Sequence, residues 1–218
     1  MAQKLFDYEI DKQFDYENGF YLTSHKLRLS KIIAQYELYK MITNLPGHVV
    51  ECGVYKGSSI IRFMTFRDML ENPYSRKVIG FDIFGKFPVS GDKNDIDYIN
   101  KFEKAGGSGI SKTELEKVLS YKEFFNYELV EGDIKNTIPA YVEQHKELKI
   151  ALLHIDVDIY EPTKIILENL FDRIVKDGIL VLDDYSTVPG ETKAIDDYFG
   201  NRRIEKLPYS HTSSFIKK

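Results

Sequence analysis

Four aspartates close two apolar runs of the chain. "HIDVDIY" carries Asp156 and Asp158, and "GILVLDDY" contains Asp183 and Asp184. Such apolar runs predict buried strands, and neighbouring parallel strands bring their carboxyl ends to one edge of a sheet. Carboxylates gathered there repel one another unless protons, hydrogen bonds or a cation neutralise them. Oxygen-only ligands favour Mg²⁺, then Ca²⁺ or Mn²⁺; alternatively, single aspartates cap helices or face solvent. His154 is interpreted as a hydrogen-bonded core histidine, with a metal or general-base role as the alternative.

A glycine turn follows the first strand-like run. In "VVECGVYKGSS", Glu51 lies near the end of the run, Gly53 and Gly57 lie in the turn, and a helix begins at Ser58 or Ser59. Glycine lets a ligand approach the backbone, and a helix N-terminus attracts anionic groups. The turn matches neither the P-loop nor the G-x-G-x-x-G dinucleotide motif. An ordinary strand-to-helix turn is the alternative interpretation.

Two further acids end the next two strand-like runs. Asp82 closes "KVIGFD" and Asp133 closes "FNYELVEGD". A carboxylate in the position of Asp82 accepts hydrogen bonds from ribose hydroxyls in nucleoside-binding α/β folds. Glu51 suits an ammonium group, and Asp133 suits an adenine amino group. Together the three acids predict a nucleoside-bearing, partly cationic cofactor without phosphates, and S-adenosylmethionine has these properties.

The elements that must position these residues alternate along the chain. Strands are predicted over residues 48–52, 77–82, 125–133, 149–156 and 178–184, and helices over 26–42, 58–70, 162–177 and 191–200. This alternation predicts an α/β fold with a doubly wound, mostly parallel sheet. The tail, residues 202–209 and 211–218, predicts an antiparallel hairpin.

One segment, residues 84–110, interrupts the alternation with five glycines and many charges. It is interpreted as a lid over the site, with an inert surface loop as the alternative, because ligands of such folds bind outside the carboxyl ends of the strands. A capping box from Ser111 to Glu114 predicts a helix that runs to Leu119. We divide the chain into an N-terminal arm and covering helix (1–45) and a main domain (46–218).

The composition excludes several classes of protein. The 218 residues carry a formal net charge of −4 and one cysteine, Cys52, which is expected to be a small buried hydrophobe. The acidic balance gives no support for nucleic-acid binding, and a single cysteine excludes an intramolecular disulfide. We find neither a signal peptide nor an apolar run long enough for a membrane span, and expect a soluble, cytoplasmic protein without a membrane partner.

The motifs "VVECGVYKGSS", "GFDIFGKFP", "HIDVDIYEPT", "GILVLDDY" and "PGETKAIDDYF" together resemble the macrocin O-methyltransferase family. The resemblance implies a Rossmann-like methyltransferase fold, S-adenosylmethionine and Mg²⁺ as cofactors, and methylation of a hydroxyl on a sugar, glycoconjugate or natural product. It implies a metal on Asp156, Asp183 and Asp184, whereas Asp158 matches a motif position that is not a ligand. The implied cofactor residues are Glu51, Gly53, Val54, Tyr55, Ser58, Ser59, Asp82, Gly132 and Asp133, with Arg28 reaching over from the covering helix.

The chemistry of this resemblance gives Asp156 the catalytic role. A bound Mg²⁺ acidifies a coordinated hydroxyl, and Asp156 takes its proton before the oxygen attacks the sulfonium methyl. Two other functions stay open: a cofactor- and metal-binding scaffold without catalysis, and a metal-dependent hydroxylase or hydrolase on the same sheet. The aromatic arm, residues 1–25, suggests a homodimer.

Overall fold

The computed structural model describes residues 4–5, 8–86, 93–209 and 214–218. Its main sheet has seven strands in the order β5-β4-β3-β6-β7-β9-β8. These strands are β3 (His48–Cys52), β4 (Val78–Asp82), β5 (Tyr127–Glu131), β6 (Ile150–Ile155), β7 (Ile174–Leu182), β8 (Glu205–Lys206) and β9 (Ser214–Lys217). The pairs among β3 to β7 are parallel, and β9 pairs antiparallel with β7 and β8. The predicted doubly wound sheet with an antiparallel C-terminal pair is confirmed.

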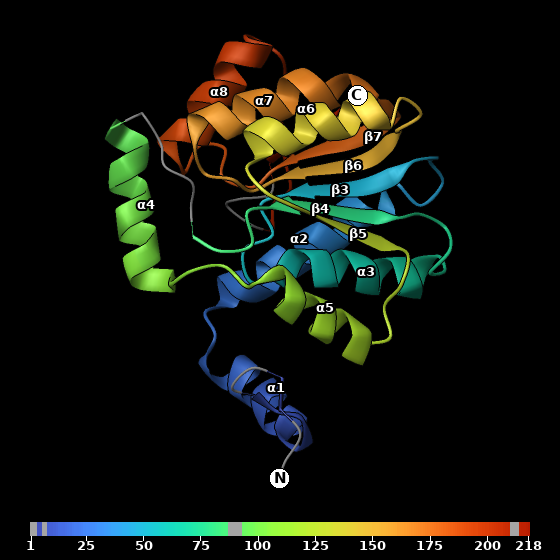
Figure 1. Ribbon diagram of the computed structural model, residues 1–218, viewed down its shortest axis with the longest axis vertical. Coiled ribbons are helices and arrows are strands. Elements are labelled where there is room, and N and C mark those ends of the chain that lie inside the picture. The colour runs from blue at the N-terminus through green and yellow to red at the C-terminus, as the bar shows by residue number, and fades with distance from the viewer. Residues whose placement is uncertain (1–3, 6–7, 87–92, 210–213) are drawn as a thin grey trace.

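Helices cover both faces of this sheet (Figure 1). α6, α7 and α8 lie on one face and α2, α3 and α5 on the other, while α4 stands beside the layers. The helices are α1 (Gln13–Thr23), α2 (Lys26–Lys40), α3 (Ser58–Leu70), α4 (Lys93–Gly106), α5 (Lys112–Tyr121), α6 (Ile134–Gln144), α7 (Tyr160–Leu170) and α8 (Pro189–Phe199). The predicted capping box of α5 is present.

The central strands are apolar because helices bury both of their faces. All six residues of β6 are buried, and so are the last four of β3. The strand order reverses between β3 and β6, so the loops after these two strands diverge and leave a crevice at the carboxyl edge. This crevice is where the fold places a ligand.

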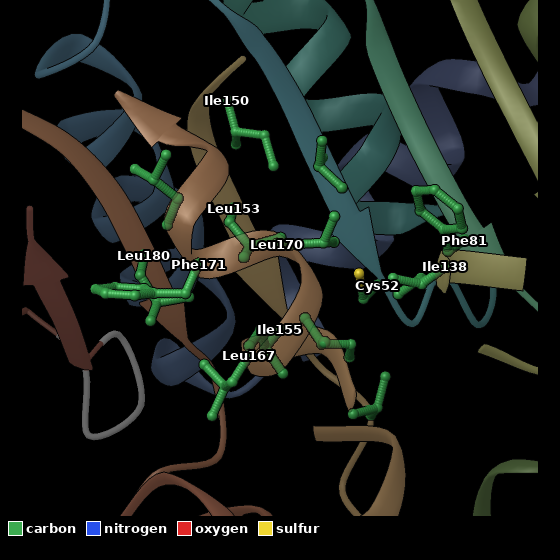
Figure 2. Close-up of a cluster of buried hydrophobic side chains, with 14 of the residues drawn as sticks. Cys52, Phe81, Ile138, Ile150, Leu153, Ile155, Leu167, Leu170, Phe171 and Leu180 are labelled. Atoms are coloured by element: carbon green, nitrogen blue, oxygen red, sulfur yellow. The ribbon is translucent and has the colours of Figure 1, made fainter. Parts of the chain in front are cut away.

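The sheet separates two hydrophobic clusters, one under each helical layer. Figure 2 shows the cluster beneath α6 and α7, where Cys52 lies near Ile138 and Leu170. The Cys52 side chain is fully buried, and burial raises the pKa of its thiol well above the usual value. The prediction of a small buried hydrophobe is therefore confirmed.

The prediction of one helix over residues 162–177 is wrong in its second half. α7 ends at Leu170, a 3₁₀ turn covers Phe171–Arg173, and β7 already begins at Ile174. The apolar spacing runs on through this region, which hides the boundary. The register between β6 and β7 shifts after Ile150, and Asp177 has φ of 65°, as in a bulge that interrupts the strand.

Two helices escaped the sequence analysis. Two residues separate the end of β5 from the start of α6, and Pro139 of α6 argues against a helix because it lies in the helix interior, where proline removes a backbone hydrogen bond. α4 lies within the segment 84–110, whose residues 87–92 are outside the described part of the chain. The lid role of this segment stays a prediction.

The N-terminal arm projects away from the sheet (Figure 1). It comprises the strand pair β1 (Lys4–Leu5) and β2 (Tyr8–Glu9), a 3₁₀ turn and α1, none of whose residues is buried. In the part of the chain that the structure describes, no helix combines the length and apolar character needed to cross a membrane.

Candidate active site

A cavity of about 760 Å³ opens at the carboxyl edge of the sheet. Its lining includes every predicted site residue except one: Gly53, Val54, Tyr55, Ser58, Ser59, Asp82, Gly132, Asp133, Asp156, Asp183 and Asp184. The exception is Glu51, which is fully buried behind the wall. Arg28 of α2 also lines the cavity, as the resemblance implies.

Gly53 is needed for a close approach between two loops. Its φ is 91°, and a Cβ atom built there would lie 1.8 Å from the carbonyl oxygen of Asp156. The expected reason for this glycine was room for a ligand, but the space is filled by the loop after β6. Gly57 serves as the N-cap of α3 with φ of 81° and no side-chain cap. Backbone N–H groups in the first turn of α3 therefore have no capping side chain, beside the cavity-lining Ser58 and Ser59.

Asp82 organises the glycine turn through backbone donors. Its Oδ2 accepts hydrogen bonds from the N–H groups of Val54 and Tyr55, at 2.6 and 2.9 Å, and its Oδ1 accepts one from Phe84 at 2.6 Å. These three donors fix the carboxylate at the cavity wall. Oδ1, which accepts one hydrogen bond, keeps a lone pair for a further donor, such as a ribose hydroxyl.

Asp133 is the N-cap of α6. Its Oδ1 accepts a hydrogen bond from the N–H of Lys135 at 2.9 Å, and the Lys135 ammonium lies 3.5 Å from Oδ2. Gly132 beside it has φ of 138°, a conformation that favours glycine. Both residues line the cavity, so the capping role and contact with a ligand are compatible.

A buried polar chain connects the cofactor side of the sheet with the acids. Glu51 of β3 and His154 of β6 are register partners, and His154 Nδ1 lies 3.1 Å from Glu51 Oε1. On its other side, His154 Nε2 lies 3.5 Å from Asp183 Oδ1. Burial alone lowers the pKa of His154, but the carboxylates of Asp183 and Glu51 outweigh it and raise this pKa to about 10. The structure thus confirms a hydrogen-bonded core histidine.

The aspartates meet just beyond the ends of β6 and β7. Asp156, Asp158 and Asp184 can each offer one oxygen so that the three atoms lie within 4.8 Å of one another, and His154, Asp156 and Asp183 form a second such group. Asp158 comes inward because its φ is 65°, rather than through the alternation of a strand. The first group differs from the predicted ligand set by including Asp158 in place of Asp183.

Burial, followed by repulsion between the carboxylates, raises the pKa values of most of these acids. Burial and the neighbouring Asp183 raise the pKa of Asp156 to about 7. Burial, followed by the carboxylates of Asp156 and Glu191, raises the pKa of Asp184 far above its usual range. Burial alone would also raise the pKa of Asp183, but His154 and Lys31 outweigh this effect and hold the pKa of Asp183 below its usual range.

Three contributors to the site were missed by the sequence analysis. Lys31 of α2 forms an ion pair with Asp183, and the Tyr98 hydroxyl of α4 donates a 2.6 Å hydrogen bond to Asp158 Oδ1. Glu191 of α8 is fully buried, and its Oε1 accepts a hydrogen bond from the N–H of Asp184 at 3.1 Å. Only Glu191 gave a signal, as an acid in the first turn of a predicted helix.

Solved structures with the same architecture cover most of the chain. The calicheamicin methyltransferase CalS11 aligns with 98% of this chain and 88% of its own, with a TM-score of 0.71 and 24% identity. The O-methyltransferase NovP aligns with 87% of this chain and 79% of its own, with a TM-score of 0.75 and 21% identity. The fold is therefore a Rossmann-like methyltransferase fold.

The family follows from the sequence itself. The model of the macrocin-O-methyltransferase (TylF) family matches residues 24–211, and the chain belongs to this family. It is similar to a tetracenomycin 4'-O-methyltransferase of Streptomyces olivaceus, with 29% identity over 73% of this chain and 60% of that protein. It is also similar to demethyldecarbamoylnovobiocin O-methyltransferase of Streptomyces niveus, with 29% identity over 71% of this chain and 59% of that protein. The chain thus spans about three fifths of these relatives' lengths.

Proposed function

We propose that the protein is an S-adenosylmethionine- and Mg²⁺-dependent O-methyltransferase that acts on a hydroxyl of a sugar, glycoconjugate or natural product. One observation carries this proposal: a single cavity joins the glycine turn and Asp82 on one side to the acids Asp156, Asp158 and Asp184 on the other. A methyl donor and a metal-bound hydroxyl must meet within bonding distance, and this cavity offers both their sites.

The residues on the donor side fit S-adenosylmethionine, which supplies an electrophilic methyl group. The N-terminus of α3 lacks a side-chain cap and attracts the donor's carboxylate. Asp82 is held in the cavity lining by three backbone N–H groups and lies at the end of β4, the position from which a carboxylate accepts ribose hydroxyls in nucleoside-binding α/β folds. We assign binding of the donor to the turn residues Gly53 to Ser59, Asp82, Gly132 and Asp133. Glu51 supports them from behind the wall, since it does not reach the cavity.

The residues on the other side fit a divalent cation. Five acids, the four aspartates and Glu191, gather here, and the cations that lower the pKa values of Asp156 and Asp183 most are Lys31 and His154. Asp156, Asp158 and Asp184 can each offer one oxygen so that the three atoms lie within 4.8 Å of one another, as in a metal site with oxygen ligands. Mg²⁺ held by Asp156, Asp184 and either Asp158 or Asp183 would lower the pKa of a coordinated acceptor hydroxyl.

Asp156 is our candidate for the general base. It lies at the junction of the two sides, because its carbonyl oxygen contacts Gly53 while its carboxylate belongs to both groups of acids. About a quarter of its side chain, 27%, is exposed to the cavity and solvent, so an acceptor can reach it. In the protein without metal, burial and Asp183 raise its pKa to about 7, so this carboxyl group exchanges protons near neutral pH. Asp156 thus removes the hydroxyl proton while the oxygen attacks the methyl carbon.

α4 provides the wall on which we place the acceptor. Tyr98, Phe102 and Ala105 line the cavity, and the rings of Tyr98 and Phe102 are stacked with centroids 6.0 Å apart. Aromatic faces beside carboxylates suit a sugar or another hydroxylated ring. The similar proteins named above act on glycosylated or aromatic natural products by their names, which supports this class of acceptor.

The first experiment is calorimetric titration with S-adenosylhomocysteine, with and without Mg²⁺, followed by transfer of a labelled methyl group to a panel of hydroxylated glycosides. We expect micromolar binding, and transfer that EDTA stops and Mg²⁺ restores. Absence of S-adenosylhomocysteine binding would sink the proposal, and transfer that survives EDTA would remove the metal from it. Binding without transfer to any acceptor would favour the scaffold, and an unmethylated but altered acceptor would favour a hydroxylase or hydrolase.

We also propose a homodimer formed through the N-terminal arm. Phe14, Tyr21 and Leu22 expose 70%, 61% and 85% of their surface, an unusual concentration for one short helix. Light scattering after gel filtration tests this proposal. A monomer at micromolar concentration contradicts it, and F14S/L22S should shift a dimer toward the monomer.

A further inference from the structure

Lys31 brings a positive charge into the acidic site from a distant part of the chain. It lies on α2, and its Nζ is 2.5 Å from Asp183 Oδ2, a residue 152 positions further along. The same Nζ is 3.6 Å from Asp156 Oδ2. Less than a quarter of the Lys31 side chain, 23%, is exposed, so the ammonium is committed to these acids rather than to solvent.

The contacts of Asp183 differ from those of the other acids in the group. One of its oxygens faces the ammonium of Lys31, and the other faces the ring of His154 at 3.5 Å. One oxygen of Asp183 is thus paired with an ammonium group, and the other lies close to the imidazole ring. Asp156, Asp158 and Asp184 are the acids whose oxygens converge on a common point. Access of a metal to Asp183 therefore requires that Lys31 give up its position.

We propose that Lys31 is an internal counter-cation that competes with the divalent cation for Asp183 and Asp156. This inference rests on the metal part of the proposed function. With Lys31 in place, the acids left for a metal are Asp156, Asp158 and Asp184. When Lys31 is displaced, Asp183 replaces Asp158 and the predicted ligand set is complete.

The competition links the metal to the covering helix. The Lys31 ion pair anchors α2 at the edge of the cavity, to which Arg28 of the same helix also contributes. A metal that displaces the ammonium releases this anchor, so the middle of α2 opens more often in the metal-loaded protein. Lys31 is a positioning residue in this scheme, because it acts through Asp183 and contacts no reacting atom.

The test measures binding of MnCl₂ by the loss of the free Mn²⁺ signal in electron paramagnetic resonance. K31M removes the competing charge and should bind Mn²⁺ at least about tenfold more tightly, whereas K31R keeps the charge and should stay near the wild type. K40M is the matched control, because Lys40 lies on the same helix and pairs with Glu37 at 3.0 Å, outside the cavity lining. Its affinity should equal that of the wild type.

Hydrogen exchange of the wild-type protein provides an independent readout. Mg²⁺ should speed exchange of the amides near Lys31 in α2, and K31M should exchange at the fast rate with or without Mg²⁺. Equal Mn²⁺ affinity of wild type and K31M, or exchange in α2 that Mg²⁺ leaves unchanged, overturns the role of Lys31 alone. Absence of Mn²⁺ binding in every variant overturns the metal site together with this inference.

Discussion

Both sides of the cavity place carboxylates at the ends of buried strands, but the groups that stabilise these carboxylates differ between the two sides. Asp82 is stabilised by three backbone N–H groups, which cannot leave without unfolding the turn. Of the aspartates beyond β6 and β7, Asp183 and Asp156 pair with the ammonium of Lys31, whereas burial and repulsion raise the pKa values of Asp156 and Asp184. The first arrangement gives a rigid acceptor of hydrogen bonds, and the second gives a group of acids whose charge depends on neighbouring side chains, at which we propose that a metal binds.

The largest expected effect comes from breaking the acidic side at its centre. D156N keeps the shape of the side chain but removes the proton acceptor and one metal ligand, so turnover should fall by at least about 1,000-fold. Binding of S-adenosylhomocysteine should change by less than about twofold, since the donor side is intact. Steady-state kinetics and calorimetry measure the two quantities. A variant that keeps full activity excludes Asp156 as the base.

Removing Asp82 should have the opposite effect to D156N: it should weaken binding of the donor and leave metal binding intact. D82A removes the acceptor of three backbone hydrogen bonds and of the expected ribose contact, so S-adenosylhomocysteine should bind about 10- to 100-fold more weakly. Mn²⁺ affinity should stay within about twofold. D82N is the matched control, because its side-chain oxygen still accepts some of the N–H groups and its loss should be smaller. A large loss of Mn²⁺ binding in D82A would show that the two sides are not separable.

The raised pKa of Asp156 predicts that the stabilisation of the folded protein by Mg²⁺ depends on pH. The folded protein holds the pKa of Asp156 near 7, above its unfolded value, so without metal the free energy of unfolding falls as pH rises from about 4 to about 7. Mg²⁺ binds the ionised form, and its stabilisation should therefore grow between pH 5 and pH 8. We expect the Mg²⁺-induced rise in Tm to reach about 5 °C at pH 8 with Mg²⁺ about 100-fold above its Kd.

Differential scanning fluorimetry with Mg²⁺ or EDTA checks this prediction. D156N is the control, since its Mg²⁺-induced rise in Tm should lose the step near pH 7. His154, whose pKa is raised to about 10, adds a loss of stability between about pH 6.5 and 10, which is common to both proteins. A rise in Tm that is equal at pH 5 and pH 8 contradicts the assignment.

The smallest effect should come from the contact between α4 and the acids. Y98F removes one hydrogen bond to Asp158, worth about 1 kcal/mol, and should change the KM of the acceptor by about fivefold. Its kcat and donor affinity should stay close to those of the wild type. Y121F is a suitable control, because Tyr121 is 45% exposed at the end of α5 and does not line the cavity. Equal acceptor KM values in both variants would remove α4 from acceptor binding.

The sequence predicted this fold well where the physics is local. Runs such as residues 149–156 are apolar because both faces of the strand are buried, and that pattern is visible without any knowledge of the fold. The aspartates after these strands were located for the same reason. Prediction from the sequence fails near Ile174, where β7 begins. Apolar residues continue there from the helix into the strand, so their spacing does not separate the two elements.

The missed residues share a different cause. Lys31 and Tyr98 belong to elements outside the strand-end loops, and nothing in their local sequence shows that they turn toward the acids. Glu51 was placed with the donor because it ends a strand, yet its side chain points to the side of the sheet where His154 lies. Long-range packing decides such orientations, and it leaves no periodic signal in the sequence.

The contact between Gly53 and the carbonyl oxygen of Asp156 limits how this protein can be redesigned. Because a Cβ atom has no room at Gly53, the glycine turn and the loop that carries Asp156 pack in direct backbone contact, and a change in one loop requires a matching change in the other. Neither loop can be grafted from a relative without its counterpart. α4 is also joined to this turn, because the Tyr55 hydroxyl donates a 2.7 Å hydrogen bond to the carbonyl oxygen of Gly106. New substrate preferences are therefore best engineered on α4 with changes that spare this contact.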